Sequence, residues 1–317
     1  MEPKYGPHNG NSPRYTGIRT FMKLPHVQEV DDDIDVAVVG LPFDTAASYR
    51  SGARFGPSSI REMSMLLRPA NAYHKMNPFQ RCSVIDYGDL PLLPGNIQES
   101  YSIISKAYKQ FAENNIIPIG LGGDHSVALG ELRGLKEHYG KPLSLVQFDA
   151  HGDTWDNYWG MKYTHGTPFK RGVEEGLIDP HSSIQIGLRG TVYDPGDLDV
   201  AKEMGFDIVT ADELRLLSPQ ELSKRIKDRV GDKLVFLTFD IDFFDPAYAP
   251  GTGTPEPGGF TSAEGLSYLR QLPKMNLAGL DLVEVLPALD QSEITAHLGA
   301  TIVYECMSLI GKFGITR

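Results

Sequence analysis

Short, largely apolar runs that alternate with helical patterns are the feature that most constrains how this chain can fold. Seven runs of four to seven residues indicate buried strands. Apolar strands that alternate with helices are typical of a parallel sheet covered on both faces. The sequence therefore predicts an α/β fold, a three-layer α/β/α architecture with a mainly parallel central sheet. The predicted strands are 36–39, 116–121, 143–148, 183–188, 206–209, 234–239 and 279–285. The predicted helices are 97–114, 128–139, 219–230, 262–272 and 296–310, and a further helix is predicted to start within 57–62.

The chain has 317 residues and shows no linker, internal repeat or low-complexity tract. We expect residues 1–30, which include a short apolar stretch at 21–24, to form an irregular N-terminal arm, with packing on a neighbouring chain as one option. We expect residues 31–317 to form a single domain, because a regular strand-and-helix pattern begins there and continues to the end.

Charge and composition narrow the class of protein. The 30 basic and 41 acidic residues give a net charge of −11, which disfavours nucleic acid as a partner and suits a small cation, although solubility alone would also explain it. No apolar run approaches the ~20 residues of a membrane-spanning helix, and no secretory signal is visible at the start. The two cysteines form no CxxC motif, so we expect a cytoplasmic protein that does not act on a membrane.

Polar residues follow three of the predicted strands, at the edge of a parallel sheet where ligands bind. A Gly-Gly-Asp-His-Ser segment follows 116–121, an Asp-Ala-His-Gly-Asp segment follows 143–148, and an Asp-Ile-Asp segment follows 234–239. Side chains two residues apart in extended chain point the same way, so each segment can converge on one point. The three segments supply six candidate metal ligands, which are His125, Asp149, His151, Asp153, Asp240 and Asp242.

Six ligands are too many for one metal ion and suit two ions that share carboxylates. Four aspartates carry four negative charges, which two divalent ions would neutralise. The oxygen-rich set favours Mn²⁺, while Ni²⁺, Co²⁺ and Zn²⁺ stay open. Two such ions could activate a water molecule for hydrolysis. Each segment alone is more often a loop or a helix cap, and the prediction depends on their joint position after three strands.

At these segments the sequence resembles the ureohydrolase superfamily of arginase and agmatinase. The likeness runs from about residue 14 to the end and continues in the stretches 245–255, 281–285 and 290–296. It implies an arginase-like fold, a binuclear centre of two Mn²⁺ per chain, and hydrolysis of a guanidinium group to urea and an amine. It also implies a homo-oligomer, a trimer or a hexamer.

The resemblance also assigns roles to particular residues. One metal would take His125, Asp149, Asp153 and Asp240, and the other would take Asp149, His151, Asp240 and Asp242. Glu284 would receive the guanidinium and His165 would shuttle protons, which makes these two and the bridging Asp149 the predicted catalytic residues. Without a metal site, Glu284 would be interpreted as an ion-pair residue and His165 as a structural loop histidine.

The substrate is where the sequence leaves alternatives open. We expect agmatine, which would give putrescine and urea. The alternatives are guanidinobutyrate, guanidinopropionate or another guanidine, and a further alternative is an inactive partner subunit of an oligomer. Trp155 stands where arginases usually carry an asparagine that holds the amino-acid end of arginine, so arginine is disfavoured.

Two segments could determine the choice of substrate. Trp155, Asp156 and Asn157 are predicted to bind the far end of a cationic substrate, and the alternative is that their loop is a packed, oligomer-facing segment. Arg50 and Arg54 lie in a loop after the first strand. If either approaches the site, it would hold a substrate carboxylate and favour a guanidino acid; otherwise both form backbone or interface contacts.

Overall fold

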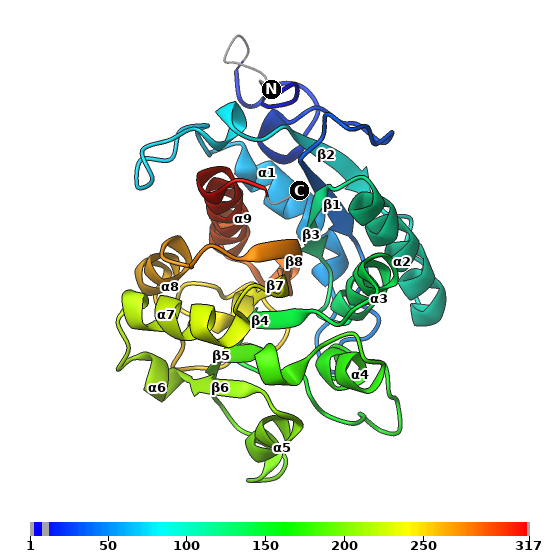
Figure 1. Ribbon diagram of the computed structural model, residues 1–317, viewed down its shortest axis with the longest axis vertical. Coiled ribbons are helices and arrows are strands. Elements are labelled where there is room, and N and C mark those ends of the chain that lie inside the picture. Colours follow the sequence, from blue (N-terminus) through cyan, green and yellow to red (C-terminus); the bar gives the residue numbers. More distant parts are fainter. Residues whose placement is uncertain (1–2, 8–12, 316–317) are drawn as a thin grey trace.

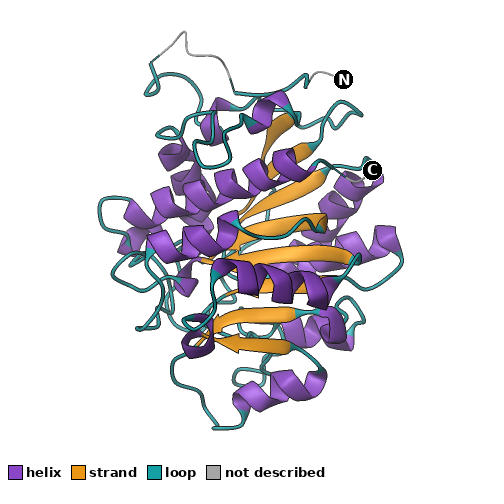
Figure 2. Cartoon of the chain, turned by 60° about the vertical axis from the view of Figure 1, so that its left-hand side comes forward, coloured by secondary structure: helices purple, strands orange, loops and turns teal. Residues whose placement is uncertain are grey.

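The computed structural model describes residues 3–7 and 13–315. Within these ranges eight strands form one sheet in the order β2-β1-β3-β8-β7-β4-β5-β6, and all neighbouring strands are parallel. Helices cover both faces (Figures 1 and 2), which confirms the predicted three-layer fold. The strands are β1 (Val36–Leu41), β2 (Val84–Asp89), β3 (Ile117–Gly122), β4 (Ser144–Phe148), β5 (Ile184–Leu188), β6 (Asp207–Thr210), β7 (Leu234–Asp240) and β8 (Asn276–Val283).

The helices divide into two layers, each sharing a hydrophobic core with one face of the sheet. One layer holds α2 (Ile97–Glu113), α3 (Val127–Tyr139), α4 (Pro168–Glu174) and α5 (Asp197–Met204). The other layer holds α1 (Gly56–Ser64), α6 (Ala211–Leu214), α7 (Pro219–Val230), α8 (Ser262–Arg270) and α9 (Ile294–Phe313). Figure 1 shows these layers on opposite sides of the strands.

Local sequence signals explain why several predicted helices begin where they do. Ser218 and Glu221 form a capping box at the start of α7, and Thr261 and Glu264 form another at the start of α8. In each box the hydroxyl accepts a backbone N–H and the glutamate reaches back to the cap residue, which satisfies donors that the helix leaves unpaired. Helix α3 ends before Gly140, whose φ of 70° is a left-handed conformation that glycine adopts without strain.

Four elements were not predicted: β2, α4, α5 and α6. β2 is an edge strand that contains buried Asp86, so its sequence lacks the apolar run of the central strands. The three helices have only four to eight residues, too few for a clear helical period.

The apolar stretch of the N-terminal arm packs within its own chain. Phe21, Met22 and Leu24 are buried in the core beside α1 and α9, and the Phe21 N–H donates to Asp86 at 2.7 Å. These three side chains are therefore covered by their own chain, and packing of the arm on a neighbouring chain stays a prediction. Parts of the arm, residues 1–2 and 8–12, lie outside the described residues, and its boundary at residue 30 stays a prediction.

Helix α9 is long and apolar enough, by length and composition alone, to cross a membrane. Of its most apolar 18-residue window, 83% is buried inside the protein. This burial is that of a core helix, since α9 packs against α1, α8 and the sheet.

Candidate metal centre and substrate cavity

The six candidate ligands meet at the carboxyl ends of the central strands. His125 follows β3, the pair Asp149 and His151 follows β4, and Asp240 ends β7. These strands are separated only by β8 in the middle of the sheet. The sheet order therefore brings together side chains that are up to 117 positions apart in sequence, as the strand-end rule predicts.

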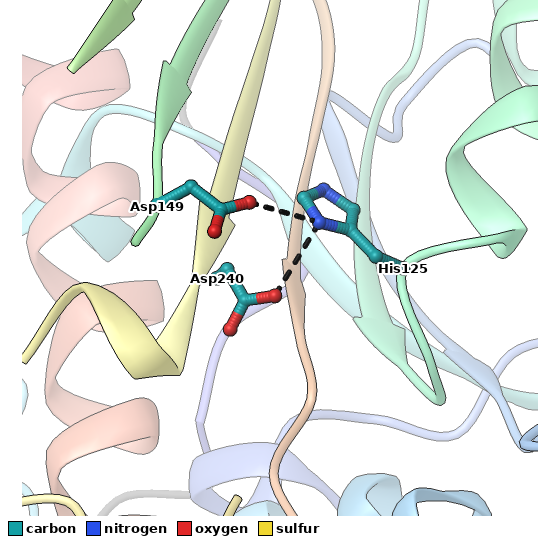
Figure 3. Close-up of side chains that lie close together, drawn as sticks. All are labelled: His125, Asp149 and Asp240. Atoms are coloured by element: carbon teal, nitrogen blue, oxygen red, sulfur yellow. Dashed lines mark ion pairs between the residues drawn. The ribbon is translucent and has the colours of Figure 1, made fainter. Parts of the chain in front are cut away.

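His125 is the centre of the first group of candidate ligands. Its Nδ1 lies 3.1 Å from Asp149 Oδ2, 2.8 Å from Asp153 Oδ2 and 3.4 Å from Asp240 Oδ2. Figure 3 shows the carboxylates of Asp149 and Asp240 turned toward this nitrogen. Three carboxylates around one imidazole nitrogen are spaced as a metal ion would need them.

Asp149 also belongs to a second group, with His151 and Asp242. His151 Nδ1 lies 3.0 Å from Asp242 Oδ2 and 3.6 Å from Asp149 Oδ1. A residue shared by two groups is the geometry expected of a bridging carboxylate. The two groups together contain five of the six predicted ligands, and Asp153, close to His125, completes the set.

The electrostatics of this ligand cluster (the six residues His125, Asp149, His151, Asp153, Asp240 and Asp242) call for added positive charge. Burial and the charges of Asp242 and Asp149 raise the pKa of Asp240 well above its ordinary value. Burial, with the charge of Asp149, also raises the pKa of Asp242 to about 6. Burial alone would raise the pKa of Asp149, but the imidazoles of His125 and His151, with ring nitrogens 3.1 and 3.6 Å from its oxygens, lower it. Carboxylates that repel one another in a buried site are stabilised by cations.

Orphaned polar atoms in the cluster fit divalent cations. The Nδ1 of His125 and the Oδ2 of Asp242 are buried and make no hydrogen bond within the described residues. Unpaired buried polar atoms are costly, and each of these atoms points into its group of candidate ligands. The donor set of imidazole nitrogen and carboxylate oxygen suits Mn²⁺, Co²⁺, Ni²⁺ or Zn²⁺. The residues present therefore fit a pair of divalent ions.

Two residues that sequence reasoning missed hold the ligands in place. Thr238 Oγ1 lies 2.8 Å from His125 Nε2, which leaves Nδ1 facing the carboxylates. Gln147 donates from Nε2 to Asp149 Oδ2 at 2.7 Å. Each precedes a ligand aspartate by two positions on a strand, so the alternation that grouped the aspartates could also have identified both.

A cavity of about 370 Å³ opens beside the cluster. Its wall includes three candidate ligands, His151, Asp153 and Asp240, together with His165. Aromatic side chains form much of the rest, and neighbouring rings of Trp155, Tyr158 and Tyr193 lie 5.6–6.1 Å apart between centroids. The remaining wall residues are Ser48, Tyr49, Arg50, Gly166, Thr191, Val192, Gly253, Thr254, Pro255 and Glu256.

Glu284 and His165 lie together between the cavity and the cluster. Glu284 Oε1 accepts the backbone N–H of His125 at 2.9 Å and lies 3.0 Å from His165 Nδ1. Glu284 follows β8 with a φ of 64°, a strained conformation for a residue other than glycine. Burial alone would lower the pKa of His165, but the hydrogen bond and charge of Glu284 raise it to about 9.

Glu284 lies next to the cavity wall, behind Gly253. The glutamate is 2% exposed and is not one of the wall residues. Gly253 does line the cavity, and a Cβ placed on it would lie 3.6 Å from Glu284 Oε2. No hydrogen bond is assigned to Oε2 within the described part of the chain. Oε2 therefore lies next to Gly253, a residue of the cavity wall.

The loop of Trp155, Asp156 and Asn157 is only partly in the cavity wall. Trp155 lines it and donates from Nε1 to Asp197 at 3.1 Å. Asp156 and Asn157 are exposed and do not line it. The Asp156 carboxylate instead accepts from Arg171 at 2.7 Å, and the amide of Asn157 donates to Asp156. The prediction that Asp156 and Asn157 bind substrate is therefore not supported, because the loop turns both side chains outward.

Of the two arginines in the loop after β1, one lines the cavity and the other does not. Arg54 pairs with buried Asp44, its Nε donating at 2.6 Å, and does not line the cavity. Arg50 does line it, and its Nε is buried without a hydrogen-bond partner within the described residues. Arg50 is thus the arginine that a ligand could use.

The fold, the paired ligand groups and the adjoining cavity define a metal-dependent hydrolase of the arginase type. The chain matches the sequence model of the Arginase family over residues 34–309. It therefore belongs to this family.

Similar proteins act on more than one guanidino compound. The chain is 42% identical to the guanidinobutyrase of Pseudomonas aeruginosa. The 307 aligned residues cover 96% of this chain and 96% of that protein. It is 41% identical to the mitochondrial agmatinase of Gallus gallus, over 94% of this chain and 87% of that protein. The structure of proclavaminate amidino hydrolase from Streptomyces clavuligerus superposes with a TM-score of 0.91 and 39% identity, over 96% of this chain and all of the other. The chain is thus a guanidino hydrolase by family, and these relatives differ in substrate.

Proposed function

We propose that this chain hydrolyses the guanidinium group of a small substrate to release urea and an amine. The observation that carries the proposal is the buried ligand cluster, with His125 and Asp242 atoms that make no hydrogen bond within the described residues, beside a cavity whose wall residue Gly253 adjoins Glu284. The inactive-subunit alternative is disfavoured, because all six candidate ligands are present in one cluster beside the cavity, and Glu284 and His165 lie next to that cluster.

We propose two Mn²⁺ as the metals. His125, Asp149, Asp153 and Asp240 would hold one ion, and Asp149, His151, Asp240 and Asp242 would hold the other. Bound there, the ions would supply Lewis-acid chemistry that activates water for attack on the guanidinium carbon. Two ions would also neutralise the charge excess of the four aspartates.

Glu284 is the proposed guanidinium receptor. A carboxylate can pair with two N–H groups of a planar guanidinium, which fixes the orientation of the reacting carbon. Oε1 is already held by His125 and His165, so its position is fixed before substrate arrives. Oε2 remains for the substrate.

We propose agmatine as substrate, with putrescine and urea as products. The far end of agmatine is an ammonium, which Glu256 and the rings of Trp155, Tyr158 and Tyr193 would receive at the cavity wall. A second candidate is a guanidino acid such as guanidinobutyrate or guanidinopropionate. Arg50 favours it, because this residue lines the cavity and its guanidinium could pair with the substrate carboxylate.

The charge at the far end of the substrate separates the two candidates. We would measure kcat/KM for agmatine, 4-guanidinobutyrate and 3-guanidinopropionate in the Mn²⁺-loaded wild type, Arg50→Met and Glu256→Gln. For agmatine, Glu256→Gln should lower kcat/KM at least tenfold and Arg50→Met should not lower it. A loss confined to Arg50→Met on the acids would replace agmatine with a guanidino acid. No urea from any guanidino compound would contradict the proposed function itself.

The assembly, the domain and the cellular location of the protein are also proposals. We propose a homo-oligomer, a trimer or a hexamer, formed by a single catalytic domain over residues 31–317. A cytoplasmic location is supported by Cys82 and Cys306, which are both buried and unpaired.

A further inference from the structure

Ser48 makes two contacts with the same nitrogen of His165. It lies in the loop after β1 and lines the cavity. Its backbone N–H donates to His165 Nε2 at 3.0 Å, and its Oγ lies 2.7 Å from that nitrogen. The other ring nitrogen, Nδ1, lies 3.0 Å from Glu284 Oε1.

The backbone contact determines the tautomer of the neutral ring. A backbone N–H can only donate, so Nε2 must accept. In the neutral ring the proton is therefore on Nδ1 and is donated to Glu284. The hydroxyl of Ser48 can donate to Nε2 in this state, and it can accept from Nε2 when the ring is charged.

Two opposing influences act on the second proton of His165. The carboxylate of Glu284 favours the charged ring, and Asp153 and Asp124 add to its effect. The N–H of Ser48 opposes it, because a proton on Nε2 would face another N–H. A substrate guanidinium on Glu284 would offset the carboxylate charge, so substrate binding would weaken the hold of His165 on that proton.

We infer that the Ser48 hydroxyl carries a proton from His165 to the nitrogen that leaves the substrate. Charged His165 gives its Nε2 proton to Ser48 Oγ, while Ser48 gives its own hydroxyl proton to the leaving nitrogen. The carbon has by then added the oxygen of a water molecule. Its bond to the leaving nitrogen breaks, the electron pair of that bond stays with the amine, the added oxygen forms the carbonyl of urea and gives its proton to solvent, and His165 ends neutral with its proton on Nδ1. Ser48 is unchanged after the step, and solvent returns the proton to His165. The inference rests on the proposed function.

Ser48→Ala is the direct test, because it removes the hydroxyl and keeps the backbone N–H. In the Mn²⁺-loaded protein we expect the single-turnover rate of urea formation to fall about 10- to 100-fold, a share of the 10²–10⁴-fold that positioned proton transfer contributes. KM, metal content and melting temperature should stay unchanged, and the solvent deuterium isotope effect should increase. Ser48→Thr, which keeps a hydroxyl, should restore most of the rate.

Two further measurements separate proton transfer from a merely structural contact. In a His165→Ala background, Ser48→Ala should cause no further loss, since the proton donor is already missing. Ser58→Ala is the matched control, because it removes an exposed hydroxyl that donates only to the Phe55 carbonyl, and it should leave the rate unchanged.

A Ser48→Ala rate within twofold of wild type would overturn the inference. An equal loss in Ser48→Thr, or an additive loss on His165→Ala, would overturn it as well. In each case a wild type that releases urea would leave the proposed function standing. A metal-loaded wild type that releases no urea would instead contradict the proposed function.

Discussion

Two buried charged clusters in this protein are built on opposite principles. The Arg61 cluster joins α1 to the edge strand β2, and it consists of the buried pair Arg61 and Asp86 with the exposed Asp89 at its edge. Arg61 donates to both carboxylate oxygens of Asp86, at 2.8 and 3.0 Å, and to Asp89 at 2.5 Å. Burial alone would lower the pKa of Arg61, but the two aspartates raise it. This cluster supplies its own counter-charge and needs no ligand.

The ligand cluster instead carries an excess of negative charge. Its four aspartates exceed what two imidazoles can neutralise, and the pKa values of Asp240 and Asp242 are raised. His125 Nδ1 and Asp242 Oδ2 lack hydrogen bonds within the described residues, whereas each oxygen of Asp86 accepts at least one. Burial of charge therefore does not by itself indicate a functional site. An unbalanced, unsatisfied cluster beside a cavity does.

Glu284→Gln should have the largest effect on activity. It removes the charge that is proposed to receive the guanidinium while keeping the shape of the side chain. Losing one partner of a buried charge pair costs about 2–5 kcal/mol, or about 30-fold to several thousandfold in kcat/KM. Urea release from every guanidino compound should fall, with metal content unchanged. Normal turnover of any one compound by this variant would show that its guanidinium binds elsewhere.

Within the ligand cluster, the loss of metal caused by a substitution should increase with the number of ions that the residue is proposed to bind. Asp149→Asn and Asp240→Asn should weaken both ions, because these residues are the proposed bridges, while Asp153→Asn should weaken one. We expect losses of metal affinity beyond the 10–100-fold typical when only a hydrogen-bonding partner of a ligand is changed. Metal content per chain is the measurement. Two tightly held ions in Asp240→Asn would refute its bridging role.

Arg61→Met should produce the reverse pattern, a loss of stability without loss of metal. It leaves Asp86 buried without its counter-charge, which costs about 3–5 kcal/mol in the free energy of unfolding. Chemical denaturation of the metal-loaded variant measures the loss, and metal analysis provides the control. If Arg61→Met lost metal in the folded state, the two clusters would not be independent.

Trp155→Ala should have the smallest effect of these four. Contact of a cation with an aromatic ring is worth about 0.5–2 kcal/mol, so KM for agmatine should rise about 2- to 30-fold with kcat nearly unchanged. Asp156→Asn is the matched neighbour, because Asp156 accepts from Arg171 outside the cavity. Equal increases in KM for both variants would mean that the loop acts by its fold and not by the ring.

The sequence predicts the parts of this site that depend on local rules. The convergence of the six candidate ligands could be predicted because strand ends meet in a parallel sheet and side chains two apart share a side. The strand β2 could not be predicted from sequence in this way, since its buried Asp86 depends on a partner from another element, Arg61 of α1.

The cavity wall depends on loop directions that no periodic pattern encodes. Asp156 adjoins Trp155 in sequence, yet only the tryptophan faces the cavity, because Arg171 holds the carboxylate outside. Ser48 and Arg50 enter the wall from the loop after β1, and only the folded chain shows that Ser48 contacts His165 while Arg50 stays unpaired.

The most direct test of the central claim is the metal content per chain before and after chelation, measured together with urea release and melting temperature. The account predicts two Mn²⁺ per chain in the active protein. Chelation should remove both ions, abolish urea release and lower the melting temperature, because four buried aspartates then repel one another without counter-ions. Added Mn²⁺ should restore all three. Full urea release and an unchanged melting temperature in metal-free protein would contradict the account.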